Sequence, residues 1–394
     1  MLAAALRLAV LILAEGRPDR FDFPDSHRYV RIARNIVAGL GPIESKQVQA
    51  GTDPLYPYLL SIGVRLGFAD PLEAMRFGRA VNSLFSLASV LLLALFSRRL
   101  FGNRPALFAA AILAVDPILL FFTGLVLTET PYITLLLAGF YCLTLGSHLR
   151  RGLIAAAAAG ALLGLATCMR SSSLFMPLAV VPLLWHFSGG PPRRRLAAIG
   201  LLIAGAAIML VPTVSRNYRL FRRFVPVCTH GGAGLLEALG PWADGGPGMD
   251  RIKYPTFPPG IDECERDRLC RVAAWGWARE HPADTLHLAW VKLRRTWSVT
   301  INAAEYASSL YALVAWTTVA PEFLLAAFGA LGLLLQRRFW PLILLLLPAV
   351  YFTLVHMVFV GSVRYRLPAM PFLFVLAGLA VDLILQRRRR KDQG

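Results

Sequence analysis

The chain has 394 residues, of which 56% are hydrophobic and only 16% are charged. A soluble globular domain carries about 25% charged residues, so this composition excludes an ordinary soluble domain and predicts a polytopic membrane protein. The net charge of +18 comes from arginine clusters between apolar runs. It does not come from a continuous basic face, which argues against nucleic-acid binding.

Ten apolar runs along the chain are long enough, or nearly so, to cross a membrane as helices. The runs cover residues 1–14, 80–97, 105–123, 128–146, 152–169, 173–189, 196–213, 313–335, 339–360 and 367–385. Several lie at the short limit, and the stretch 105–146 is also compatible with a hairpin that enters from the inner side. We therefore predict an all-α polytopic protein, a single integral-membrane domain of about ten transmembrane helices over residues 1–394.

The arginine clusters fall on one side of the membrane in this arrangement, which marks that side as cytoplasmic. They are Arg98-Arg99, Arg150-Arg151, Arg193 to Arg195, Arg337-Arg338 and Arg387 to Arg390. Both termini are then predicted to be cytoplasmic, in what we expect to be a bacterial cytoplasmic membrane. The basic tail, residues 386–394, is expected to contact anionic inner-leaflet lipid.

Two longer polar stretches fall on the outer side, residues 15–79 and residues 215–311, the second before the last three spans. In the first, apolar residues from Ser26 onward recur at helical spacing, and Gly39 can end that amphipathic helix. A second surface helix is predicted to start at Thr52-Asp53-Pro54. In the larger segment we expect helices over 262–281 and 283–297.

Four acids on or near the outer face are candidates for chemistry. Asp25 and Asp53 each precede a predicted helix, so each is either an N-cap or a functional group. Asp116 and Glu129 lie in or beside apolar runs, where ionisable groups are costly and often functional, with capping of a broken helix as the alternative. Glu129 is the stronger candidate of these two, because it faces the same outer loop as Asp25.

Four outer-side arginines lie close to span ends, where topology does not require positive charge. They are Arg170, Arg216, Arg364 and Arg366. Arginine binds phosphate bidentately, and the alternative is contact with lipid headgroups. Carboxylates and arginines at one membrane face suit transfer of a sugar from a lipid phosphate. Arginine would hold the phosphate leaving group while a carboxylate removes the proton of an acceptor hydroxyl.

Metal and cysteine chemistry leave weaker signals. No spacing typical of a metal site exists, and no cofactor is predicted, although two carboxylates could hold a divalent cation. Cys264 and Cys270 flank a polar stretch on the outer side, where a disulfide is allowed, and Cys228 would be left over.

Five pieces of sequence, in order, resemble the GT-C glycosyltransferases that use polyprenyl-phosphate sugars, namely the protein O-mannosyltransferase and lipid A aminoarabinose transferase relatives. The pieces are Pro24-Asp25-Ser26 with Tyr29, Ala33 and Gly39; Asp53-Pro54-Leu55-Tyr56-Pro57; Thr128-Glu129; Ser215-Arg216-Asn217-Tyr218 with Phe224-Val225-Pro226 and Gly231-Gly232; and Arg364-Tyr365-Arg366-Leu367-Pro368. Together they cover most of the chain, and the ordered set is more specific than any one piece.

The resemblance implies a GT-C-like bundle and a site on the outer face. It implies that Asp25 is the catalytic base or its partner. Ser26 stands where many relatives carry a second acid, so this acid either comes from elsewhere, with Glu129 or Asp53 as candidates, or is absent. It implies that Arg216, Arg364 and Arg366 bind the donor phosphate, together with Arg170. The residues expected in supporting roles are Tyr29, Asp53, Tyr56 and Tyr365.

The expected activity is inverting transfer of a hexose or pentose from a polyprenyl-phosphate donor to a glycan, lipid or protein hydroxyl of the cell envelope. One alternative is a lipid or solute transporter or flippase, which would show repeated halves and polar groups at mid-membrane. Another is a structural subunit or an inactive relative. The outer-face position of the acids favours the enzyme.

Overall fold

A computed structural model describes residues 1–146, 149–300 and 309–392, and over these residues it contains helices and no strand. The α-helices are α1 (Leu2–Gly16), α2 (Pro24–Val37), α3 (Leu55–Arg65), α4 (Pro71–Phe101), α5 (Asn103–Val115), α6 (Pro117–Thr123), α7 (Glu129–Leu143), α8 (Leu149–Met169), α9 (Met176–Ala179), α10 (Val181–Phe187), α11 (Pro192–Phe221), α12 (Gly231–Ala238), α13 (Glu263–Glu280), α14 (Pro282–Thr296), α15 (Ser309–Leu335), α16 (Phe339–Val358), α17 (Val363–Arg366) and α18 (Met370–Lys391). Short 3-10 helices are η1 (Pro18–Phe21), η2 (Ser171–Ser173), η3 (Met249–Arg251) and η5 (Leu367–Ala369). The predicted all-helical fold is confirmed.

Six of the described helices are long and apolar enough to cross a membrane, namely α4, α8, α11, α15, α16 and α18. The pair α5 and α6 makes a seventh candidate that is bent by 57°. The chain is thus a multi-pass membrane protein, with fewer full-length spans than the ten apolar runs. Two of the runs form helices of only 15 residues, α1 and α7, about 22 Å long against a hydrocarbon core of roughly 30 Å. The run 173–189 is broken into α9 and α10.

The bend between α5 and α6 has a local cause. Asp116 separates the two helices and its carboxylate accepts a hydrogen bond of 2.6 Å from the backbone N–H of Leu119. Pro117 follows as the first residue of α6, a position where its missing N–H costs nothing. The capping alternative for Asp116 is therefore confirmed.

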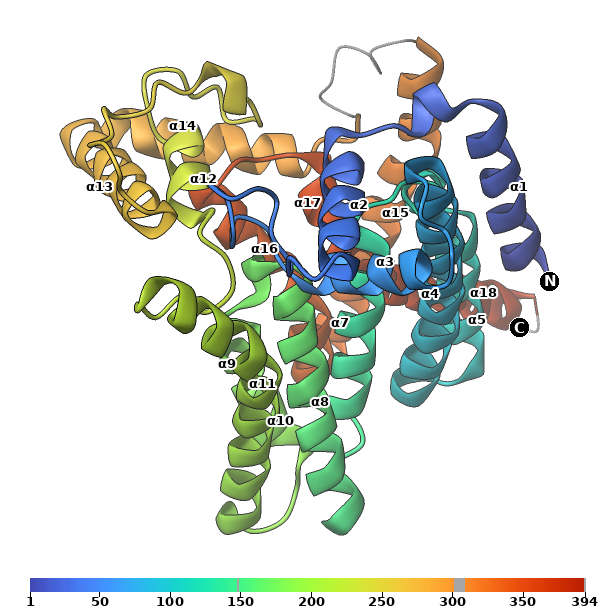
Figure 1. The fold of residues 1–394 in the computed structure, drawn as a ribbon. Coiled ribbons are helices and arrows are strands. Elements are labelled where there is room, and N and C mark those ends of the chain that lie inside the picture. Colours follow the sequence, from blue (N-terminus) through green and yellow to red (C-terminus); the bar gives the residue numbers. More distant parts are fainter. Residues whose placement is uncertain (147–148, 301–308, 393–394) are drawn as a thin grey trace.

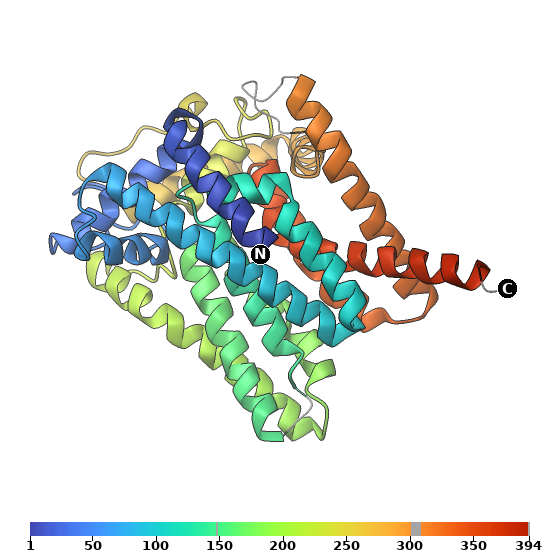
Figure 2. The same cartoon turned by 90° about the vertical axis from the view of Figure 1, so that its right-hand side faces the viewer.

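Helix α18 packs against α5 and α15, and its C-terminal end projects to one side of the molecule (Figure 2). Phe372 of α18 is fully buried between two other phenylalanines, with ring centroids 4.8 Å from Phe140 and 5.9 Å from Phe96. Elsewhere helices approach closely through glycine. A Cβ at Gly160 of α8 would lie 2.0 Å from the carbonyl oxygen of Leu202 on α11.

The polar segments gather at one end of the molecule. Figure 1 shows α2, α12, α13, α14 and α17 there, with α8, α10 and α11 extending away from them. The predicted helix over 262–281 is α13, which Asp262 caps with a 2.7 Å hydrogen bond from the N–H of Glu265. The predicted helix over 283–297 is α14.

All five cysteines are free thiols, so the disulfide that the sequence allowed between Cys264 and Cys270 is absent. Both residues lie on α13, six positions apart. At 1.5 Å per residue they are separated by about 9 Å along the helix axis, beyond the reach of a disulfide.

Candidate active site

Asp25 lies in the first turn of α2, at the end of the molecule where the polar segments gather (Figure 1). The helix begins one residue earlier, at Pro24, and has no side-chain cap. The carboxylate of Asp25 instead accepts a hydrogen bond of 2.9 Å from Nη1 of Arg364, on α17. Its other oxygen lies 3.7 Å from Nη1 of Arg28, one turn along the same helix. The side chain keeps 29% of its surface exposed, so a hydroxyl group can reach it.

Glu129 is the first residue of α7 and its side chain is only 1% exposed. Its Oε1 accepts a hydrogen bond of 2.5 Å from Nη1 of Arg170 and another from Nε of Arg364. Arg170 also donates to the hydroxyl of Thr128, at 3.2 Å. Residues far apart in the chain thus form one group of two acids and two arginines, which we name the Asp25–Glu129 cluster: Asp25, Glu129, Arg170 and Arg364.

The cluster stabilises its own charges. Burial disfavours the charged form of Arg364, but Glu129 and Asp25 more than offset this, and the pKa of Arg364 lies well above its usual value. The pKa of Arg170 is raised in the same way, with Glu129 opposing the effect of burial. Both arginine side chains stay partly exposed, by 21% for Arg364 and 16% for Arg170. They can therefore still donate hydrogen bonds to an anionic ligand.

The three tyrosines expected in supporting roles pack around this cluster. Tyr29 and Tyr56 meet edge to face with ring centroids 5.2 Å apart, and the hydroxyl of Tyr56 donates to Oδ1 of Asn82 at 3.2 Å. The guanidinium of Arg170 lies 5.7 Å from the ring centroid of Tyr365, which favours the charged arginine. These contacts fix the arginine and the first turns of α2 and α3 relative to one another.

Asp53 holds the loop between α2 and α3 against the segment that follows Arg170. Its Oδ2 accepts a hydrogen bond of 3.1 Å from the N–H of Ser171, the residue after Arg170. The capping alternative is not what the structure shows, because α3 begins at Leu55 with no side-chain cap. Burial raises the pKa of Asp53, against the hydrogen bond from Ser171. Its position supports Arg170, whereas Glu129 is the acid that contacts both arginines.

Arg216 lies apart from the cluster, at the end of α11. It donates to the backbone carbonyl oxygens of Gln49, at 2.5 Å, and Pro42, at 3.4 Å, and to the side chain of Asn217. These contacts hold the loop between α2 and α3 against α11. A phosphate would have to compete with them.

Arg366 points away from the cluster although it is only two residues from Arg364. It is 1% exposed and donates to the carbonyl oxygens of Thr296, at 3.3 Å, and Ser298. Its guanidinium lies 5.1 Å from the ring centroid of Phe323. This environment favours a structural role for Arg366 over binding of a donor phosphate.

Arg366→Ala is therefore expected to lower the thermal stability of the protein. The change leaves buried carbonyl oxygens without a donor, at a cost of about 1–3 kcal/mol. Thermal unfolding in detergent, followed by size-exclusion chromatography, measures this effect. The donor Michaelis constant of the folded fraction should stay unchanged. A raised constant at unchanged stability would place Arg366 in the donor site after all.

Two contact residues were not singled out by sequence. Arg28 lies three positions after Asp25, the spacing at which helical side chains meet, so the pattern carried a usable signal. Tyr132 lies under the guanidinium of Arg170, with 5.8 Å to the ring centroid, and no pattern distinguished it from the other aromatic residues of the apolar run. Within the described residues, no group of three or more His, Cys, Asp or Glu side chains could hold a metal ion.

Part of the chain matches a known protein family. Residues 51–216 match the family model of dolichyl-phosphate-mannose-protein mannosyltransferase, a stretch that is less than half of the chain and includes Glu129 and Arg170. Curated protein sequences gave no match.

The whole chain is similar to the oligosaccharyltransferase of Archaeoglobus fulgidus. The apo form aligns with a TM-score of 0.60 at 14% identity, over 100% of this chain and 51% of that one. The same archaeal protein, AglB, in complex with an inhibitory peptide and a dolichol-phosphate, aligns with a TM-score of 0.57 at 14% identity, over 97% of this chain and 50% of that one. The chain thus spans about half the length of this protein.

A weaker match is ArnT from Cupriavidus metallidurans bound to undecaprenyl phosphate, with a TM-score of 0.43 at 17% identity over 96% of this chain and 77% of that one. That score is too low to support an inference. The alignment with the archaeal oligosaccharyltransferase establishes the fold: over its whole length this chain has the helical arrangement found in about half of that protein.

Proposed function

We propose that this protein transfers a monosaccharide from a polyprenyl-phosphate donor to a hydroxyl group of a cell-envelope acceptor, on the outer face of the cytoplasmic membrane and with inversion at the anomeric carbon. The observation that carries the proposal is the bridge that Arg364 makes between Asp25 and Glu129. The bridge puts an accessible base beside two partly exposed arginines.

The two acids differ in the exposed fraction of their side chains, and we assign them different roles on this basis. Glu129, at 1%, is enclosed by Arg170 and Arg364 and orients both guanidinium groups. Asp25, at 29%, is open to an incoming hydroxyl. A single accessible carboxylate suits general-base catalysis in one displacement, which inverts the anomeric carbon, whereas a retaining mechanism needs a second carboxylate as nucleophile.

The proposed transfer is a single displacement at the anomeric carbon. The acceptor oxygen forms a bond to the anomeric carbon while the bond from that carbon to the donor phosphate oxygen breaks. The hydroxyl proton passes to the carboxylate of Asp25. The phosphate leaves with the bonding electron pair, still attached to its lipid, and the developing charge is stabilised by the N–H groups of Arg364 and Arg170.

Two likenesses support a lipid-phosphate donor. The family model that residues 51–216 match is named for dolichyl-phosphate-mannose, and a structure of the archaeal protein of the same fold is in complex with a dolichol-phosphate. A lipid-linked donor also fits a site placed at the ends of membrane helices, since the lipid chain stays in the bilayer while its phosphate lies at the surface. We infer a hexose or pentose as the sugar.

Comparing envelope lipids, glycans and proteins from cells with and without the gene tests this function. We expect one sugar modification to disappear, identified by mass spectrometry, and to return with the wild-type gene. Protein reconstituted in liposomes provides the second assay. Formation of a glycosidic bond supports the transferase, whereas movement of a lipid between leaflets without such a bond would establish the flippase alternative.

A further inference from the structure

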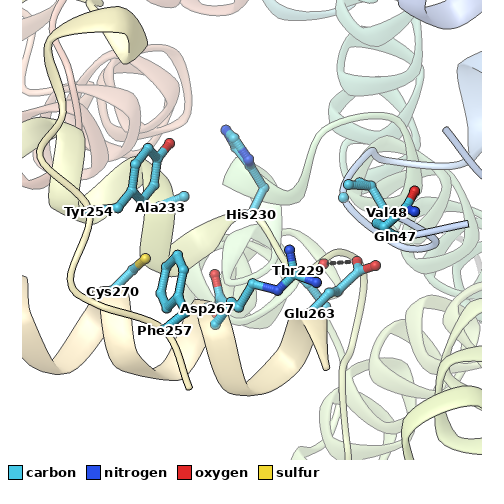
Figure 3. A pocket seen from close by; sticks show the side chains of 12 residues that line it. Gln47, Val48, Thr229, His230, Ala233, Tyr254, Phe257, Glu263, Asp267 and Cys270 are labelled. Atoms are coloured by element: carbon cyan, nitrogen blue, oxygen red, sulfur yellow. Dashed lines mark hydrogen bonds between the residues drawn. The ribbon is translucent and has the colours of Figure 1, made fainter. Parts of the chain in front are cut away.

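A pocket of about 290 Å³ lies at the outer end of the molecule, between the first outer loop, α12 and α13 (Figure 3). Gln47 and Val48 of the first loop form one side, and Tyr254 forms the opposite side. Phe257 and Arg266 also line the pocket. None of the residues around the pocket belongs to a helix that could cross a membrane. This position suits a polar, water-exposed ligand.

The carboxylates that line this pocket accept hydrogen bonds from backbone N–H groups of the neighbouring segments. Glu263 of α13 accepts hydrogen bonds from the backbone N–H groups of Gln49, at 2.5 Å, and Ala50, at 2.9 Å. Asp267 accepts from the N–H of Gly232, at the start of α12, at 2.5 Å. Helix α13 thus anchors both the first loop and α12, and these contacts fix the shape of the pocket.

Other groups remain for a ligand. The rings of Tyr254 and Phe257 lie with centroids 6.1 Å apart, and Tyr254 is 45% exposed. The guanidinium of Arg266 and the side-chain amide of Gln47 also line the space. Flat apolar rings together with a few hydrogen-bonding groups are a surface on which a sugar ring can pack its C–H face and bind its hydroxyls.

The pocket adjoins the Asp25–Glu129 cluster through two short segments. Gly51 lines the pocket, and Asp53, two residues later, contacts Ser171 beside Arg170. Two residues span at most about 7 Å. In the second segment, Thr229 and His230 line the pocket, while the preceding residue, Cys228, contacts the hydroxyl of Ser171, 3.6 Å from its sulfur. A group bound in the pocket is thus close to the reacting centre.

We propose that this pocket binds a sugar ring of a glycan acceptor and presents its hydroxyl to Asp25. The inference rests on the proposed transferase function and names the acceptor class. The volume is at the lower end of ligand pockets, which suits one or two sugar residues. A peptide that binds by adding a strand to a sheet edge would find no such edge here, because the described residues contain no strand.

Binding of envelope oligosaccharides tests this proposal. The probe is the oligosaccharide pool released from the envelope of cells that lack the gene, where an unmodified acceptor accumulates, labelled with a fluorophore. The protein is the full chain carrying Asp25→Asn, which prevents turnover. We expect one oligosaccharide to be retained, and its affinity to fall at least 10-fold when Tyr254→Ala or Arg266→Gln is added. Trp275→Ala is the matched control, since Trp275 is also 45% exposed and lies on α13 outside this pocket.

Three outcomes would overturn the proposal: no oligosaccharide is retained, retention is unaffected by both pocket variants, or envelope peptides are retained in place of glycans. Donor binding measured in parallel shows that each variant is folded. Failure of the proposed function has a different signature. If wild-type protein transfers no sugar but a glycan is still retained through Tyr254 and Arg266, the transferase proposal falls and the glycan pocket stands.

Discussion

Asp25→Asn is expected to lower the rate of sugar transfer by about 10²- to 10⁴-fold, the range that general-base catalysis contributes. The amide keeps the size of the side chain and can still accept a hydrogen bond from Arg364, so folding and donor binding should persist. It cannot take the proton of the acceptor hydroxyl. The measurement is the initial rate of transfer from a polyprenyl-phosphate sugar by protein reconstituted in liposomes.

Asp19→Asn is the matched control for this experiment. Asp19 lies on η1, in the same outer loop, and is exposed, so its loss removes one negative charge from the loop without touching the cluster. We expect near wild-type rates for that variant. Full activity of Asp25→Asn would remove Asp25 as the base and leave its bond to Arg364 as its only role.

Arg364→Ala is expected to weaken donor binding by about 10- to 100-fold, because a hydrogen bond to a charged group contributes roughly 1.5–3 kcal/mol. The turnover rate should fall as well, since Arg364 is the residue that joins Asp25 to Glu129. Arg364→Lys should recover only part of the activity, because one ammonium group cannot reproduce the planar fork of arginine. The measurement is the donor Michaelis constant together with the turnover number.

Arg34→Ala provides the comparison for Arg364→Ala, because Arg34 lies exposed on α2, near Asp25 in sequence. It should leave the donor Michaelis constant unchanged. Thermal unfolding of each variant separates a binding defect from misfolding, since Glu129 loses one of its two arginines in Arg364→Ala. An unchanged donor Michaelis constant in folded Arg364→Ala would contradict the assignment of this arginine to the phosphate.

Much of the fold could be predicted because the signals are local. The amphipathic spacing after Ser26, which became α2, and the helix predicted over 262–281, which became α13, each involve residues within a few helical turns. The number of membrane spans was harder to predict. Hydrophobicity alone does not distinguish a full span from the 15-residue α7, which begins with the apolar run but ends at Leu143.

The site was only partly predictable, because its contacts join residues far apart in the chain. Position near a span end marked Arg170, Arg216, Arg364 and Arg366 equally, and nothing local separated them. The structure brings Arg170 and Arg364 to Glu129. It turns Arg366 toward carbonyl oxygens at the end of α14 and Arg216 toward the loop between α2 and α3. These side-chain directions depend on how α17 and the end of α11 are oriented, and tertiary packing determines both orientations.

The anomeric configuration of the product tests the central claim most directly. Wild-type protein would be supplied with a polyprenyl-phosphate sugar of known configuration and with the acceptor identified from envelope analysis, and the new glycosidic bond examined by NMR. One accessible base, Asp25, and a phosphate held by Arg364 and Arg170 predict a single displacement and an inverted anomeric carbon. A product with retained configuration would contradict this account, because it requires a second carboxylate to attack the sugar first.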